Sequence, residues 1–201
     1  MYTLLKPLLV REELLTRGMR IFTPLEFSRV FHVSHYAIKY FLEQQVKEGL
    51  LIRLKQGVYT LRTDPPSEEE IANKLYIPSY ISFEYALAYY NILPEMPYTI
   101  TSATTKPTRL FTTQNKTFSY RTIKTEAYMG YSLVRVGGRE FLIADPEKSL
   151  TDYMYFCTLG KLSNNDRFNL NLANKEKVLE YAKLYNRNRM VKEIERIYDD
   201  R

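Results

Sequence analysis

The sequence has little cysteine and no long apolar run, and each of these absences excludes some classes of protein. Cys157 is the only cysteine in 201 residues, which excludes an intrachain disulfide and a cysteine-rich zinc site. A single thiol is typical of a reducing compartment. No stretch approaches the roughly 20 uninterrupted apolar residues of a membrane span, and Lys6 and Pro7 break the apolar N-terminus. We therefore expect a cytoplasmic protein without a membrane partner.

The signatures of common enzymes are also missing. None of the seven glycines belongs to a GxxxxGK[ST] or GxGxxG loop. His32 and His35 are too few for a histidine-based metal site. The segment Asp145-Pro146-Glu147-Lys148 offers the carboxylates and lysine of a metal-dependent nuclease, but their spacing is compressed. We expect no enzymatic activity, no cofactor and no metal, with a nuclease kept as an alternative.

Basic residues are unevenly distributed along the chain, whose net charge is +6. Residues 1–63 hold ten Lys/Arg and five Asp/Glu, a net +5. Residues 64–98 hold six acids and one base, whereas residues 99–139 hold seven bases and one acid. Two basic blocks separated by an acidic one can form two nucleic-acid surfaces, or they can be chance clusters on solvated faces.

The clearest boundary is the stretch TDPPSEEE, from Thr63 to Glu70. Its two prolines interrupt regular structure, and Ser67 followed by three glutamates is typical of a helix start. The sequence thus predicts two domains, residues 1–63 and residues 64–201.

The first domain is predicted to hold three helices and a hairpin. The helices span about 4–17, 24–31 and 34–49, with Thr23 and Ser34 as N-caps. The hairpin spans 50–61, and a glycine supplies its turn.

The spacing of the second and third helices predicts a winged helix-turn-helix, with the hairpin as the wing. In this motif the third helix enters the major groove, and the wing contacts the DNA backbone. A protein-interaction module of the same shape is the alternative, but the net charge of +5 and the cationic wing tip favour DNA. The expected contacts are Ser34, His35, Tyr36, Lys39 and Tyr40 in the recognition helix, and Arg53, Lys55 and Gln56 in the wing.

The second domain is predicted to be mixed α/β (α+β), with a small, mostly antiparallel sheet and C-terminal helices. The expected helices lie at 82–91, 146–158 and about 175–198, and the expected strands at 98–103, 117–123, 131–136 and 140–143. A second basic surface is expected from Lys106, Arg109, Arg121, Lys124, Arg135 and Arg139.

Three segments, taken in order, resemble the AbiEi family of antitoxins from type IV toxin–antitoxin systems. They are SHYAIKYFLEQQVKEGLLIRLKQGVYTL (34–61), IPSYISFEYALAYYNIL (77–93) and IADPEKSLTDYMYF (143–156). The last is similar to the family's PE-x-x-L-x-D segment, through Pro146, Glu147, Leu150 and Asp152. The tyrosine-rich 77–93 segment and the long charged C-terminus depart from the family pattern.

The resemblance implies a transcriptional repressor that binds inverted repeats in the promoter of its own operon. It also implies a second basic domain that assists DNA binding. A partner toxin of the nucleotidyltransferase class would be neutralised, commonly without a stable complex. We interpret Asp145, Glu147 and Asp152 as structural residues, with Asp145-Pro146 as a turn and N-cap and Glu147 in the first helical turn.

Overall fold

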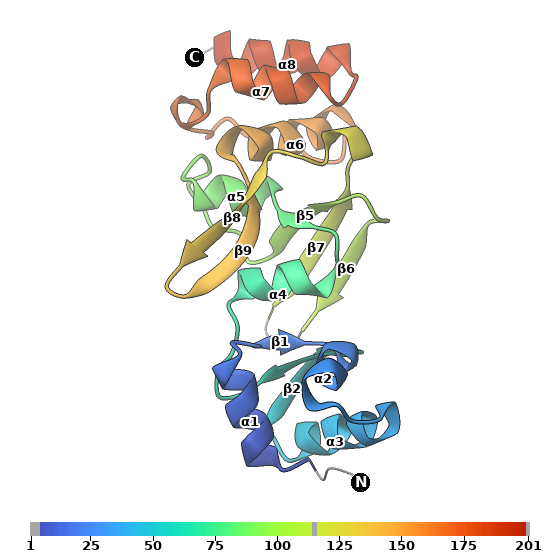
Figure 1. The fold of residues 1–201 in the computed structure, drawn as a ribbon. Coiled ribbons are helices and arrows are strands. Elements are labelled where there is room, and N and C mark those ends of the chain that lie inside the picture. The colour runs from blue at the N-terminus through green and yellow to red at the C-terminus, as the bar shows by residue number, and fades with distance from the viewer. Residues whose placement is uncertain (1–4, 114–115, 200–201) are drawn as a thin grey trace. The chain divides into compact units, whose positions relative to one another are not determined.

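The computed structural model describes residues 5–113 and 116–199 and divides the chain into two compact units, Met1–Leu75 and Tyr76–Arg201 (Figure 1). The architecture is mixed α/β, with one sheet in each unit. Within the described residues, no helix combines the length and apolar character needed to cross a bilayer.

The first unit ends with helix α4 (Glu68–Leu75), which the sequence pattern assigns to the second domain. Polar contacts tie this helix to the preceding residues. Lys74 Nζ lies 2.5 Å from a carboxylate oxygen of Glu26, and Lys55 donates to the carbonyl of Leu75. The boundary between the two compact units therefore lies at the end of α4, twelve residues after Thr63.

The rest of the first unit holds three helices and a three-stranded antiparallel sheet of order β1-β3-β2. The second and third predicted helices and the hairpin are confirmed. The first helix is shorter than predicted and begins at Pro7, a residue favoured at the first helical position. The elements are α1 (Pro7–Thr16), β1 (Ile21–Phe22), α2 (Pro24–Phe31), α3 (His35–Lys47), β2 (Leu51–Lys55) and β3 (Val58–Leu61).

Local sequence signals set the boundaries of α2 and α3. Thr23 and Glu26 form a reciprocal capping box, with Thr23 N donating to Glu26 over 2.7 Å. His32 ends α2 in the left-handed conformation, with φ of 51°. Ser34 then caps α3 by accepting from the amide of Ala37 over 3.4 Å. The two helices are therefore joined by a three-residue turn whose conformation is fixed at both ends.

The second unit holds a six-stranded mixed sheet of order β6-β7-β5-β4-β9-β8. Its elements are β4 (Tyr80–Ile81), α5 (Phe83–Tyr89), β5 (Ile100–Thr104), β6 (Arg109–Thr112), β7 (Thr117–Thr122), η1 (Thr125–Ala127), β8 (Tyr131–Val136), β9 (Arg139–Ala144), α6 (Pro146–Thr158), η2 (Leu170–Leu172), α7 (Lys175–Lys183) and α8 (Asn188–Asp199).

This sheet is larger than predicted and mixed, although most of its strand pairs are antiparallel as expected. The β6/β7, β4/β5 and β8/β9 pairs are antiparallel, but β5/β7 and β4/β9 are parallel. β4 has two residues and β6 has four, too few for a clear alternation in the sequence. β4 nevertheless joins the two halves of the sheet, because it pairs with both β5 and β9.

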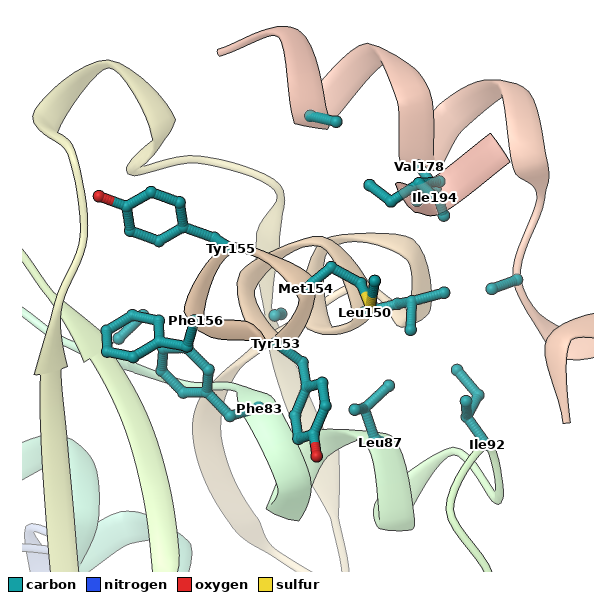
Figure 2. Close-up of a cluster of buried hydrophobic side chains, with 14 of the residues drawn as sticks. Phe83, Leu87, Ile92, Leu150, Tyr153, Met154, Tyr155, Phe156, Val178 and Ile194 are labelled. Carbon is teal, nitrogen blue, oxygen red and sulfur yellow. The ribbon is translucent and has the colours of Figure 1, made fainter. Parts of the chain in front are cut away.

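Helix α6 forms the centre of the main hydrophobic core (Figure 2). Leu150 and Met154 are fully buried among side chains that include Leu87 of α5, Val178 of α7 and Ile194 of α8. The helical C-terminal stretch predicted at about 175–198 forms two helices, α7 and α8.

The break between α7 and α8 coincides with a buried side chain. Tyr185 lies in the connection and is fully buried. Asn186 follows it in the left-handed conformation, with φ of 51°. The turn lets both helices bury apolar side chains in one core, among them Ala182 and Met190.

Candidate nucleic-acid interface

Helix α3 has one buried face and one exposed face. Ile38, Leu42 and Gln45 are buried against the core of the first unit. The exposed face carries a mixture of aromatic and charged side chains: His35, Tyr36, Lys39, Tyr40, Glu43 and Lys47. A helix with this division is anchored on one side and presents a chemically distinct surface on the other.

A groove of about 700 Å³ lies between α3 and the β2–β3 hairpin. The helix contributes His35, Lys39 and Glu43, at successive i+4 positions. The hairpin contributes Arg53, Leu54, Lys55, Gln56, Gly57 and Tyr59, and Pro24 and Leu42 complete the lining. Five of the eight predicted DNA contacts therefore line one concave surface: His35, Lys39, Arg53, Lys55 and Gln56.

Apart from Glu43, which lines the groove, several acids of the first unit are paired with cations elsewhere. Asp64 lies 3.0 Å from Arg20, and Glu26 pairs with Lys74. Burial raises the pKa of Glu26, but hydrogen bonds from Lys74 and Thr23 outweigh it and leave the pKa below its ordinary value. Within the described part of the chain, neither Lys39 nor Arg53 has an acidic partner.

The remaining predicted contacts differ in position. Lys55 lines the groove but also donates to the Leu75 carbonyl, so its ammonium group is held by α4. Ser34 uses its hydroxyl as the α3 cap. Tyr36 and Tyr40 are exposed on α3 outside the groove lining. Glu43, which the sequence interpretation did not include as a contact, lies in the lining, and its i+4 spacing from Lys39 was the available signal.

The second predicted basic surface is not brought together. Arg109 lies on β6 and Arg135 on β8, which are the opposite edges of the sheet. Lys106 precedes β6 and stands 5.6 Å from the ring centre of Tyr76. Arg139 begins β9, and Arg135 contacts Glu140 over 2.7 Å.

Two residues of that block are bonded inside the second unit. Arg121 makes two hydrogen bonds to Glu84, of 2.8 and 2.9 Å, and its guanidinium lies 4.8 Å from the ring centre of Phe83. Lys124 donates to the Tyr185 carbonyl over 2.6 Å. These two cations therefore hold the fold of the second unit.

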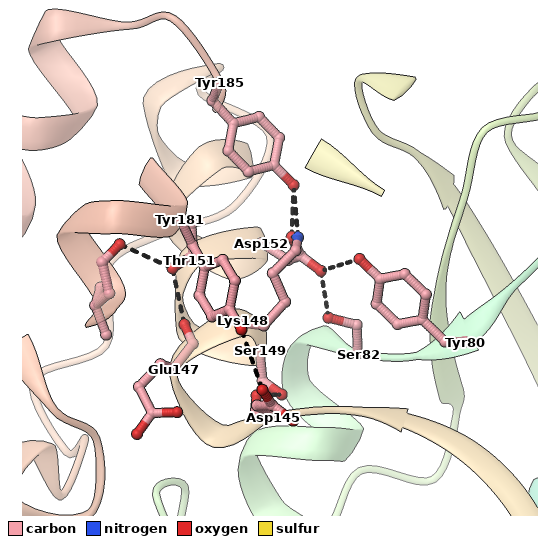
Figure 3. A network of polar contacts seen from close by, with 11 residues as sticks. Tyr80, Ser82, Asp145, Glu147, Lys148, Ser149, Thr151, Asp152, Tyr181 and Tyr185 are labelled. Carbon is pink, nitrogen blue, oxygen red and sulfur yellow. Dashed lines mark hydrogen bonds and ion pairs between the residues drawn. The ribbon is translucent and has the colours of Figure 1, made fainter. Parts of the chain in front are cut away.

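The carboxylates around the start of α6 are engaged in a polar network (Figure 3). Asp145 occupies the N-cap position as predicted, but its carboxylate accepts from Lys177 over 3.3 Å and from Tyr181 over 3.1 Å. Burial raises the pKa of Glu147, and hydrogen bonds led by that from Lys177 lower it below its ordinary value. In the described residues, no group of three His, Cys, Asp or Glu side chains could hold a metal ion.

Asp152 forms the buried centre of this network. It accepts hydrogen bonds from Lys148, Tyr185, Ser82 (2.7 Å) and Tyr80 (3.1 Å), and both Asp152 and Lys148 are fully buried. Burial lowers the pKa of Lys148, while the neighbouring Asp152 carboxylate opposes that change. The sequence interpretation considered Lys148 only as a possible nuclease lysine and missed its pairing with Asp152, although the i, i+4 spacing of the two residues is a signal for such a pair.

No protein-family model matches the chain, and a search of curated proteins finds no significant match.

Proposed function

We propose that this protein binds double-stranded DNA sequence-specifically through a winged helix-turn-helix in its first unit, and that it acts as a transcriptional repressor. One observation carries the proposal: His35, Lys39, Arg53, Lys55 and Gln56, from a helix and a hairpin, line a single groove. The arrangement fits a phosphate strand between the two elements, with α3 in the major groove and the hairpin beside it.

The positions of the charged residues in the first unit support this assignment more than the net charge of the unit does. Residues 1–75 hold eleven bases and nine acids, a net charge of only +2. Two of the four acids that α4 and the preceding linker add lie near Arg20, Asp64 at 3.0 Å and Glu70 at 3.8 Å. The groove retains Lys39 and Arg53 for an anionic partner, and such contacts give affinity that depends on salt.

The regulatory part of the proposal depends on the resemblance to AbiEi antitoxins. It assigns the operator to an inverted repeat in the promoter of the protein's own operon. It further assigns a nucleotidyltransferase-type toxin as the cognate partner, neutralised without a stable complex.

A mobility-shift titration with the duplex upstream of the gene, at two salt concentrations, tests DNA binding. Lys39→Ala should weaken specific binding. Arg53→Gln should weaken binding to all duplexes alike and flatten the log–log salt slope by about 0.9, the expected loss of one phosphate contact. Lys183→Gln, an exposed lysine on α7, is the matched control and should change neither quantity.

Two outcomes would contradict the proposal. Equal affinity of the wild type for the upstream duplex and a scrambled duplex would contradict sequence-specific binding, and with it the proposed repression. An unchanged salt slope in Arg53→Gln would show that Arg53 of the wing does not contact a phosphate. A protein-interaction module would then be the better interpretation of the first unit.

A further inference from the structure

Two tyrosines on α3 are exposed in a chain whose other tyrosines are mostly covered. Tyr36 is 84% exposed and Tyr40 is 69% exposed. Among the tyrosines that the structure describes, only Tyr98 is also classed as exposed, and Lys116 lies 4.9 Å from its ring centre. Within the described residues, Tyr36 and Tyr40 have no ring contact and no hydrogen bond.

The two rings form one short ridge on the helix. They are four positions apart in the sequence, so they lie about one turn apart, roughly 6 Å along the helix axis. Both stand in the first half of α3, close to the Ser34 cap. In a helix-turn-helix, this half of the recognition helix meets base edges.

Folding of the first unit does not account for these rings. The buried face of α3 is formed by other residues, including Ile38 and Leu42. Tyrosine also has a lower helix propensity than lysine, glutamate or alanine, so it gives no local advantage at an exposed helical site. Two large apolar surfaces held in water are therefore better explained by a partner.

The neighbouring charges select the kind of partner. Lys39 lies between the two tyrosines in sequence, and the groove that it lines holds three cations, Lys39, Arg53 and Lys55, against one acid, Glu43. Protein interfaces are depleted in lysine at their centres, whereas a polyanion is attracted by it. The apolar group that a DNA duplex presents in its major groove is the C5-methyl of thymine.

We propose that Tyr36 and Tyr40 read thymine by packing their rings on C5-methyl groups in the major groove. This inference rests on the proposed DNA-binding function and adds a base preference to it. It assigns adjacent A·T pairs to the half-site that the start of α3 contacts. The chemical feature recognised is the methyl group, so a 5-methylpyrimidine is the minimal ligand.

The test begins with duplexes selected from a random library by the full chain. Thymines enriched in the selected site are then replaced one at a time by deoxyuridine, which removes only the methyl group. The wild type should lose affinity roughly fourfold per contacted methyl, the change expected for exposing one methyl-sized group. Tyr36→Ala or Tyr40→Ala should lower affinity for the thymine duplex and remove the preference for thymine over uracil at one position.

Matched variants separate this effect from a general loss of binding. Tyr36→Phe and Tyr40→Phe keep the ring and should retain the thymine preference. Tyr98→Ala removes the other exposed tyrosine and should leave it unchanged. Circular dichroism should show folded protein for all of these variants, because each substituted side chain is largely exposed.

The outcomes distinguish this inference from the proposed function. Selective duplex binding with equal affinity for thymine and uracil would overturn the inference and leave the function in place. Retained discrimination in the double variant Tyr36→Ala/Tyr40→Ala would also overturn it. Tighter binding to the single strand than to the duplex would replace methyl contact by base stacking. Failure to bind any duplex selectively would overturn both proposals.

Discussion

The α3–hairpin groove of the first unit and the interior of the second unit use charged residues in opposite ways. On α3 and the hairpin of the first unit, Lys39 and Arg53 line an open groove and have no acidic partner in the described residues. In the second unit, Arg121 is locked to Glu84, and Lys148 is buried against Asp152. Net charge along the sequence does not distinguish these cases, because solvent exposure and pairing decide which charges can meet a ligand.

The comparison also separates two kinds of tyrosine. In the second unit, Tyr80 and Tyr185 donate to a buried carboxylate, and burial, with Asp152 beside each hydroxyl, raises the pKa of each well above its ordinary value. On α3, Tyr36 and Tyr40 lie in solvent. The high tyrosine content of the chain therefore combines structural and surface-exposed rings.

Among the substitutions that test this contrast, the one at Asp152 should have the largest effect on stability. Asp152→Asn leaves the buried Lys148 without a counter-charge and should cost about 3–5 kcal/mol of unfolding free energy. Adding Lys148→Met removes the stranded charge and should recover part of the loss. Urea unfolding of the two single variants and the double variant measures the coupling, and strict additivity would contradict a buried ion pair.

A smaller effect is expected at Arg121. Arg121→Met breaks two hydrogen bonds to a half-buried Glu84 and should cost about 2 kcal/mol of stability. Under conditions where the variant is folded, its DNA affinity should match the wild type. Arg109→Met, on the exposed face of β6, is the control and should leave stability unchanged. Lost DNA affinity with unchanged stability in Arg121→Met would break the contrast between the units.

The smallest effect is expected at Glu26, which closes the capping box of α2 and pairs with Lys74. Glu26→Gln should cost about 1 kcal/mol at neutral pH. Because the folded pKa of Glu26 lies below its ordinary value of 4.5, its stabilising contribution is present above pH 4.5 and is lost as pH falls through the folded pKa.

The stabilities of the wild type and Glu26→Gln should therefore become more similar at low pH. Urea unfolding of both proteins at neutral pH and at a pH well below 4.5 measures this change. Glu12→Gln, at an exposed position on α1, is the matched control and should have little effect at either pH. A difference between wild type and Glu26→Gln that stays constant with pH would show that the carboxylate is not stabilised by folding.

Local signals predicted much of the first unit. Thr23, Pro24 and Ser34 mark helix starts, and Gly57 marks the hairpin turn with φ of 75°. These signals operate over a few residues, so they can be recognised without knowing the rest of the fold. The α3–hairpin groove was predictable for the same reason, since its two sides are adjacent in the chain.

The sequence by itself determined the helix caps, the hairpin and the net positive charge of residues 1–63. Only the tertiary structure decided that Arg109 and Arg135 lie at opposite sheet edges, and that Tyr80 and Ser82 meet a carboxylate 72 and 70 residues away. Caps and turns arise from interactions between near neighbours. Strand order and buried polar networks depend on which distant segments pack together to remove apolar surface from water, and no local pattern specifies that choice.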